Sequence, residues 1–158
     1  MADPHPNCVL ISEILRAAGL PGEVRILPEP APTAVAAAGQ LGVPVGAIAN
    51  SLVFATAEGA PLLVLTSGAH RVDTARVAAL VGTATLSRAD ADFVRRATGQ
   101  PIGGVAPVGH PAPIRTLLDT ALAEFGEIWA AAGIPHAVFP ISYRDLLALT
   151  SAQPVAVA

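Results

Sequence analysis

The spacing of hydrophobic residues changes along the chain, and each change marks an expected element. Between Cys8 and Ala18 the apolar positions recur at helical spacing, which predicts an amphipathic helix with Asn7 as its N-cap and Gly19 as its stop. Residues 23–27, E-V-R-I-L, alternate between polar and apolar, as a half-buried strand does. The chain is therefore expected to begin with a helix followed by a strand.

The next segment predicts a helix followed by a hairpin. Thr33 ends a proline-rich stretch and is expected to cap an alanine-rich helix that runs to about Leu41, with a helical turn at 45–47 after it. Two apolar strands are expected at 48–57 and 61–66. The turn A-E-G-A joins them, and its glycine supplies the backbone freedom that a hairpin needs.

The remaining elements are shorter and mix helices with strands. Ser87 is expected to cap a helix to about Ala97, and Ser142 a helix to Leu149. The other expected elements are a helix at 73–81 ended by Gly82, strands at 83–86, 114–118, 127–131 and 137–141, and a helical turn at 120–123. Because no strand–helix rhythm repeats, we expect one mixed α+β domain over residues 1–158, with a core at about 8–151, rather than a doubly wound sheet.

Residues 98–113 interrupt this regular pattern. They include four glycines and four prolines, which exclude a regular helix or a central strand. A long loop inside a compact domain is usually functional. Gly103 and Gly104 would let the backbone approach a ligand closely, and successive amide N–H groups can stabilise a developing oxyanion. The alternative, a tight loop with a purely structural role, stays open.

Composition limits the chemistry further. All nine basic residues are arginine, which excludes mechanisms that need a lysine amine, such as Schiff-base catalysis or a P-loop. The net charge of −3 lacks the basic excess of typical nucleic-acid binders, so any RNA contact should be local, and DNA is not an expected partner. No apolar run reaches about 18 residues and the N-terminus does not resemble a signal peptide, so we expect a cytoplasmic protein without a membrane partner.

The usual nucleophiles and metal ligands do not form a recognisable motif. The four histidines are far apart in the sequence and show no metal-ligand spacing, so we expect neither a metal nor another cofactor. Cys8 lies on the apolar stripe of the first helix, which indicates a buried structural thiol. Catalysis by a cysteine or a metal ion is therefore not predicted.

Four blocks of sequence, in order, are similar to a known family. They are A-I-A-N-S-L-V-F at 47–54, L-V-L-T-S-G-A-H-R-V-D at 63–73, T-G-Q-P-I-G-G-V-A-P-V-G-H-P at 98–111, and W-A-A-A-G-I-P-H-A-V-F-P-I-S-Y-R-D-L-L-A-L-T at the tail. From about residue 8 onward the chain resembles the YbaK/EbsC-type domain, the prolyl-tRNA-synthetase-associated editing domain. The resemblance implies a mixed, partly closed β-sheet or barrel surrounded by helices.

The resemblance also implies an activity. Free-standing members of this family hydrolyse the ester of mischarged aminoacyl-tRNA, often tRNA for proline that carries alanine, cysteine or another small residue. Water attacks the ester without a metal or covalent nucleophile, the terminal ribose hydroxyl can assist, and backbone amides of a G-x-x-x-P loop hold the oxyanion. That loop is 103–107 here, so Gly103 and Gly104 inherit the oxyanion role and Pro107 the role of fixing the loop. The implied partners are the 3′ end of aminoacyl-tRNA, bound transiently, and a synthetase.

Four further positions follow from the same resemblance. Thr33 matches a position close to the amino-acid pocket, and His136 lies on the segment that lines the opposite side. Two positions depart from the family: Asn50 stands where the family usually has a lysine, in I-V-K-S-L, and Ala131 where the best-known subfamily has a serine. An amide carries no charge, and an ionic hydrogen bond contributes roughly 1.5–3 kcal/mol.

Several functions stay open on the sequence. The first is an editing hydrolase in which Asn50 positions the substrate as a neutral group. The second is a non-catalytic module that binds a tRNA end, a free amino acid or a synthetase, and the third is a small-molecule hydrolase outside translation. His70, in the loop between a strand and a helix, and His110, after the glycine-rich loop, are further candidates for the pocket, with surface or structural roles as the alternative.

Overall fold

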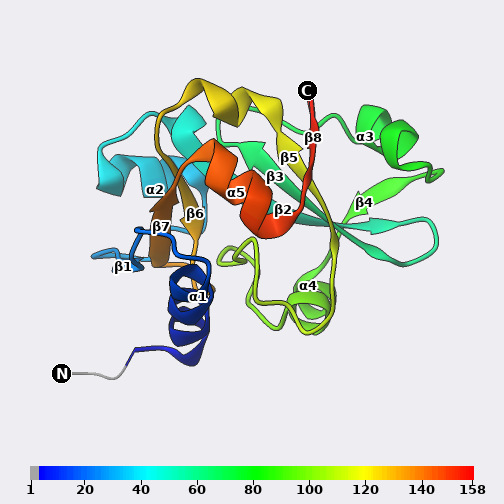
Figure 1. Cartoon of the computed structure of the whole chain (residues 1–158). Coiled ribbons are helices and arrows are strands. Elements are labelled where there is room, and N and C mark those ends of the chain that lie inside the picture. Colours follow the sequence, from blue (N-terminus) through cyan, green and yellow to red (C-terminus); the bar gives the residue numbers. More distant parts are fainter. Residues whose placement is uncertain (1–3) are drawn as a thin grey trace.

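The computed structural model describes residues 4–158 as five α-helices, two short 3₁₀ turns and eight strands (Figure 1). The helices are α1 (Pro6–Ala17), α2 (Ala34–Leu41), α3 (Thr74–Val81), α4 (Ala91–Thr98) and α5 (Tyr143–Thr150), and the turns are η1 (Val45–Ala47) and η2 (Thr120–Glu124). The strands are β1 (Arg25–Ile26), β2 (Ile48–Thr56), β3 (Pro61–Ser67), β4 (Leu86–Arg88), β5 (Arg115–Asp119), β6 (Ile128–Ala131), β7 (Ala137–Ile141) and β8 (Gln153–Val155).

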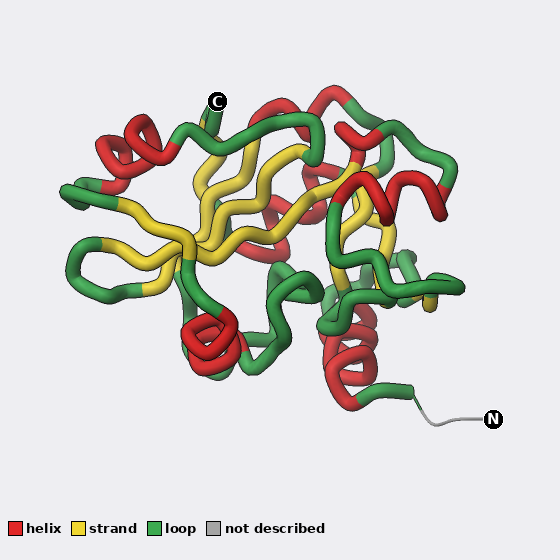
Figure 2. Tube along the Cα trace, turned by 180° about the vertical axis from the view of Figure 1, so that it is seen from behind, coloured by secondary structure: helices red, strands yellow, loops and turns green. Residues whose placement is uncertain are grey.

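All eight strands belong to one sheet with parallel and antiparallel neighbours. Its order is β1-β7-β6-β2-β3-β5-β8, and β4 pairs with β2 beside this path. The sheet crosses the centre of the molecule, with α5 on one face and α1 and α4 below it (Figures 1 and 2). The predicted mixed α+β fold is confirmed. The sheet is open, however, because its end strands β1 and β8 do not pair with each other.

Strand β2 has different neighbours along its two edges. One edge pairs antiparallel with β3 from Ala49 to Ala55. On the other edge, β6 runs parallel only beside Ile48 and Ala49, and β4 pairs antiparallel from Phe54 onward. Residues 50–53 therefore have no strand partner on that edge, and we call this stretch the β2 gap.

Most expected elements are present, and local caps explain their positions. Thr33 Oγ1 accepts a hydrogen bond from the Ala36 N–H at 3.2 Å, and Ser142 caps α5, as predicted. Gly59 has φ +81° in the β2–β3 turn, a conformation that favours glycine. These interactions join residues only a few positions apart, which is why the sequence pattern predicts them.

Two predicted helix starts are wrong. Helix α1 begins at Pro6 with His5 as its N-cap, because the proline has no N–H to satisfy, while the Asn7 amide donates to the Gly133 carbonyl at 2.8 Å. Helix α4 is capped by Asp90 rather than Ser87. Ser87 belongs to β4, which therefore lies later than the predicted 83–86.

The sequence pattern also missed the last strand, β8. It pairs parallel with β5, and beyond it the Val157 carbonyl accepts a hydrogen bond from the Asp73 N–H at 2.8 Å. Val157 is fully buried against Phe54, Val77 and their neighbours. The C-terminal segment thus fixes the start of α3 and the β3–α3 loop before it.

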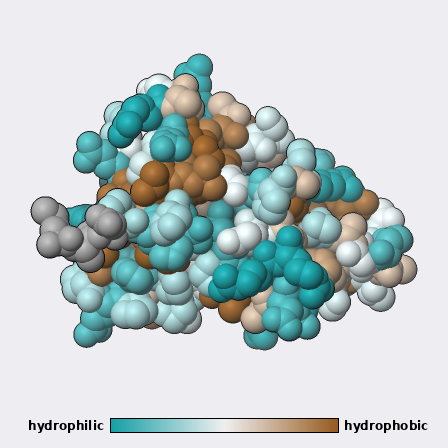
Figure 3. Space-filling model, turned by 90° about the horizontal axis from the view of Figure 1, so that it is seen from below, coloured by the Kyte–Doolittle hydropathy of each residue, from teal (hydrophilic) through white to brown (hydrophobic). Residues whose placement is uncertain are grey.

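The lower face of the molecule carries one contiguous apolar area among mostly polar side chains (Figure 3). Helix α1 lies on this side of the molecule and buries Cys8, Ile11 and Leu15, whereas its Val9 and Leu10 are exposed. Among residues 4–158, no helix is long and apolar enough to cross a membrane.

Val157→Ala should destabilise the fold because it leaves a cavity beneath β8. We expect the free energy of unfolding in urea to fall by about 1–3 kcal/mol with an unchanged m value. The matched control is Val35→Ala on α2, whose side chain is 72% exposed and should change stability by less than about 0.5 kcal/mol. Equal effects of the two substitutions would show that the C-terminal segment does not stabilise the core.

Candidate functional site

Two adjoining cavities open at the β2 gap. The larger, which we call the groove, has a volume of about 700 Å³ and reaches from α2 to β4 and the β3–α3 loop. The smaller, the recess, has a volume of about 30 Å³ and lies against β6 and β7. Their shared wall includes Thr33, Asn50, Ser51, Gly103 and Val105.

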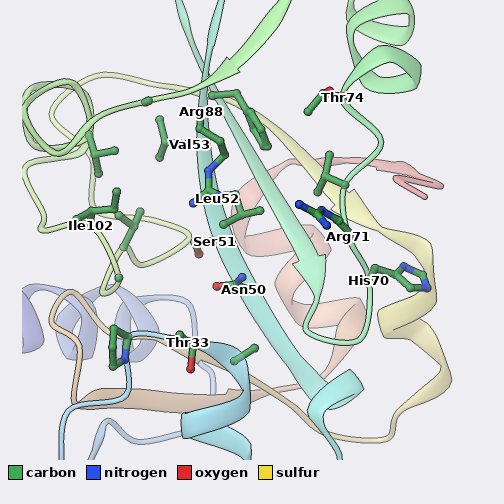
Figure 4. A pocket seen from close by; sticks show the side chains of 18 residues that line it. Thr33, Asn50, Ser51, Leu52, Val53, His70, Arg71, Thr74, Arg88 and Ile102 are labelled. Atoms are coloured by element: carbon green, nitrogen blue, oxygen red, sulfur yellow. The ribbon is translucent and has the colours of Figure 1, made fainter.

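Strand β2 contributes two consecutive residues, Asn50 and Ser51, to this shared wall (Figure 4). Consecutive side chains of a strand point to opposite faces, so both can reach one cavity only where the strand has a free edge. The Val53 carbonyl accepts a hydrogen bond from the Ala89 N–H at 3.1 Å, which shows that Val53 presents its backbone to this edge. Ser51, two residues earlier, presents its own N–H and C=O to the same edge.

Ser51 also carries a buried hydroxyl without a partner. Within residues 4–158, its Oγ is the one buried side-chain polar atom that forms no hydrogen bond. A buried unpaired hydroxyl is costly, so its presence at a cavity wall points to a ligand atom that would pair with it. The sequence gives no signal for this role, because a serine in a strand is most often solvent-exposed.

The glycine-rich loop reaches the cavities through Gly103. The Gly104 N–H donates to the Pro101 carbonyl at 3.0 Å, and Gly103 has φ +87°, as the third position of a type II turn requires. A side chain on Gly104 would collide with the backbone, since a Cβ would lie 2.4 Å from the Ile134 carbonyl carbon. Gly104 therefore packs behind the wall, lines neither cavity and already uses its N–H.

A buried glutamine holds the same loop in place. Gln100 is 2% exposed, its Oε1 accepts from the Ala106 N–H at 2.6 Å, and its Nε2 donates to the Val108 carbonyl at 3.2 Å. His110 Nε2 lies 2.9 Å from the Ala106 carbonyl, and burial lowers the pKa of His110, which favours the neutral ring. Pro107 is buried in the loop. Pro107 and His110 line neither cavity, so both stabilise the loop from behind.

The recess has walls of small side chains. Ala131 lines it together with Ala31, Ala34, Ala37, Ala49, Ala130 and Ala137, and larger side chains such as Trp129, Ile48 and Val138 complete the wall. The carbonyl of His136 accepts from the Leu27 N–H at 2.7 Å, which joins the β6–β7 segment to the chain before α2. His136 itself lines neither cavity, although its neighbours Pro135 and Ala137 do.

His70 lies at the rim of the groove, and a buried carboxylate holds its ring. Its Nδ1 is 2.8 Å from Asp119 Oδ2, and the same oxygen accepts from the Ser67 N–H at 2.9 Å. Asp119 is 1% exposed. Figure 4 shows the His70 ring turned away from Asn50. The pair therefore anchors the β3–α3 loop to β5.

Cys8 and metal ligands do not form part of this site. Cys8 is buried, as predicted, and burial raises the pKa of its thiol, which disfavours the thiolate. Within the described part of the chain, no three His, Cys, Asp or Glu side chains gather as a metal site would need.

The structure thus brings some of the predicted site residues together. Thr33, Asn50, Gly103 and Ala131 line the recess, and the first three also line the groove. His70 stands at the rim of the groove, whereas Gly104, Pro107, His110 and His136 lie outside both cavities. The functional roles of all these residues stay predictions. Sequence reasoning missed Ser51 and Gln100.

Comparisons with known proteins agree on one family. Residues 28–149 match the family model described as the aminoacyl-tRNA editing domain. A solved structure described as a proposed trans-editing enzyme for prolyl tRNA synthetase is 39% identical to this chain, with a TM-score of 0.90 and 98% of each chain covered. Hypothetical protein APE2540 is 29% identical with a TM-score of 0.86, over 94% of this chain and 98% of that one.

Curated relatives match over a shorter segment. The chain is 36% identical over 69 residues to a proline–tRNA ligase from Geobacter sulfurreducens, and 33% identical over 69 residues to the ligase from Geobacter metallireducens. Each match covers 44% of this chain and 12% of the ligase. The chain therefore corresponds to a small part of these ligases.

Gln100→Ala should loosen the glycine-rich loop. Because the Ala106 N–H would lose its acceptor in a buried place, we expect the free energy of unfolding to fall by about 1–3 kcal/mol. Gln40→Ala is the control, since this exposed glutamine also forms two hydrogen bonds with a backbone, that of Glu29. Its substitution should lower the free energy of unfolding by less than about 0.5 kcal/mol. Urea unfolding measures both variants, and a Gln100 effect no larger than the control would contradict the bracing role.

Proposed function

Because the chain belongs to the aminoacyl-tRNA editing domain family, we propose that it hydrolyses the ester of mischarged aminoacyl-tRNA and releases a small amino acid. The observation that carries this proposal is the junction of groove and recess at Asn50, Ser51 and Gly103. A nucleotide end fits the groove in size and an amino-acid side chain fits the recess. The ester that joins them would then lie at the shared wall.

The proposed reaction is direct hydrolysis. A water oxygen bonds to the ester carbonyl carbon, the bond to the ribose oxygen breaks, and a proton returns to that oxygen. The N–H groups of Gly103 and Val105 are the available donors for the oxyanion, because within residues 4–158 neither has a hydrogen-bond partner and both residues line the two cavities. A single such donor contributes about 100- to 1000-fold in rate.

Asn50 and Ser51 are suited to orient the ester or the α-amino group without charge. The Asn50 amide both donates and accepts, and the Ser51 hydroxyl is free. Thr33 is less available, because its Oγ1 already caps α2. Among the described residues, no carboxylate lines either cavity and the His70 ring points away, so the groups that can relay a proton at the proposed ester position are hydroxyls, that of the substrate ribose and that of Ser51.

The recess supports a limit on the size of the amino acid. A water-sized group needs about 10–15 Å³, so a recess of about 30 Å³ accommodates about two heavy atoms. The side chains of alanine, serine and cysteine meet this limit. The three-carbon ring of proline and the branched aliphatic side chains exceed it. A correctly charged prolyl-tRNA would therefore be spared.

A binding module without catalysis is the second candidate. The lack of a carboxylate or an inward-facing histidine among the described groove residues favours it. Such a module would bind the same RNA end and leave the ester intact.

The first test compares tRNA for proline charged with alanine, serine, cysteine or proline. We expect release of one or more of the small amino acids and hydrolysis of prolyl-tRNA slower by about 100-fold or more, because the recess excludes the ring. Release of the labelled amino acid measures each rate. Binding without any turnover by the folded protein would favour the non-catalytic module, and equal rates with proline would contradict selection by the recess.

The second test fills the recess. Ala131→Val adds two methyl groups at its wall, so we expect kcat/KM for the preferred small amino acid to fall by about tenfold or more. Ala55→Val in β2 is the matched control, because this strand alanine lines neither cavity and its substitution should leave kcat/KM unchanged. Thermal unfolding establishes that both variants fold, and equal activity of the two would exclude the recess as the amino-acid pocket.

A further inference from the structure

The groove is positively charged although the chain as a whole is acidic. The sequence has 12 acidic and nine basic residues. The groove nevertheless includes two arginines, Arg71 and Arg88, and no aspartate or glutamate among its described lining residues. This local excess of positive charge favours an anionic ligand.

Both arginines are free to bind such a ligand. Within residues 4–158, neither makes a hydrogen bond or an ion pair with another side chain, whereas Arg115, for example, donates to the Val81 carbonyl at 3.1 Å. The carboxylates of Asp73 and Asp90, close to these arginines in the sequence, cap helices and form no ion pair with either of them. Asp73 accepts from the Arg76 N–H and Asp90 from the Phe93 N–H as helix N-caps.

The two side chains approach the same part of the groove from different elements. Figure 4 shows Arg88, from β4, and Arg71, from the β3–α3 loop, both reaching toward Leu52 in the β2 gap. Arg88 lies over the Phe54 ring, with 6.0 Å between its guanidinium carbon and the ring centre. Arg71 follows His70, whose ring is held by Asp119. Strand pairing holds the backbone at Arg88 and the His70–Asp119 contact holds the loop at Arg71, while neither guanidinium has a hydrogen-bond or ion-pair partner within residues 4–158.

We propose that Arg71 and Arg88 bind successive phosphates of a single-stranded RNA 3′ end and so lead its terminal ester along Leu52 to Asn50 and Ser51. This inference rests on the proposed function for the position of the ester, whereas the binding of the phosphates is independent of it. Guanidinium groups pair with phosphate in a bidentate manner, and two of them on different elements can each bind one phosphate of a strand. The apolar side chains of Leu52 and Ile102 also line the groove and offer surfaces for bases.

The proposal also accounts for RNA binding by a chain without a general basic surface. Only two phosphates would be neutralised, so binding should be weak and local. The side chain at position 50 is neutral, so the positive charge near the ester region would come from the guanidinium groups of Arg71 and Arg88.

The test measures binding of a short RNA that copies the 3′ end of tRNA and carries no amino acid. Fluorescence anisotropy over a salt series should give a slope of log K against log salt of about −1.4, which is about 0.7 for each of two phosphates. Arg71→Gln and Arg88→Gln should each reduce this slope by about 0.7 and weaken binding about tenfold or more at low salt. Arg88→Lys should keep the slope.

Arg144→Gln is the matched control, because Arg144 is an exposed arginine of α5 that lines neither cavity and should leave slope and affinity unchanged. Unchanged slopes in both groove variants would overturn the proposal. So would equal binding of inorganic phosphate, which would indicate a single-phosphate site. RNA binding with the expected slopes but no ester hydrolysis would support this inference and refute the proposed reaction. Hydrolysis with slopes insensitive to both arginines would support the proposed reaction and refute this inference.

Discussion

The interrupted pairing of β2 is the constraint on which the site depends. Strand β6 leaves its edge after Ala49, and β4 joins the same edge at Phe54. A free strand edge presents backbone groups that need partners or a cover. The glycine-rich loop and the segment before α2 cover this edge without filling the space beside it, and the remaining volume is the groove and the recess. A continuous strand at this edge would remove both cavities.

The loop over the gap is rigid because buried polar groups replace strand pairing. Gln100 pairs with two backbone groups of the loop, and His110 pairs with a third. Buried hydrogen bonds of this kind favour one conformation of the loop. Such a fixed loop would suit the proposed oxyanion site, since donors that are already oriented need no reorganisation during the reaction. The two glycines have different structural roles, because Gly103 lines the cavities while Gly104 allows the loop to approach Ile134 closely.

The two cavities differ in what they can select. Alanines make the recess small, and its polar side chains Thr33, Asn50 and Ser51 lie where it meets the groove, so the proposed selection in the recess is by size. Arginines give the groove its charge, so it attracts an anion. Selection of a substrate that has a small apolar end and a charged end requires both, and the Ser51 hydroxyl lies where the two meet. In the proposed complex, a chain of net charge −3 would bind RNA at one place without a generally basic surface.

The sequence by itself determined the elements whose signals are local. The caps at Thr33 and Ser142 and the turn at Gly59 depend on contacts within a few residues, and their patterns predicted them correctly. The family likewise follows from the order of sequence blocks, and the family model confirms it.

Tertiary structure decided the rest, because the deciding contacts lie far apart in the sequence. Pairing with Ala55 makes Ser87 a strand residue instead of a helix cap. The free edge of β5 allows the three residues of β8 to form a strand. Ser51, Gln100 and Arg88 look like ordinary polar residues in the sequence. Only the positions of β4, β6 and the loop around β2 decide that the Ser51 hydroxyl and the Gln100 amide meet a cavity or brace its wall rather than face water, and that the exposed Arg88 lies at the groove.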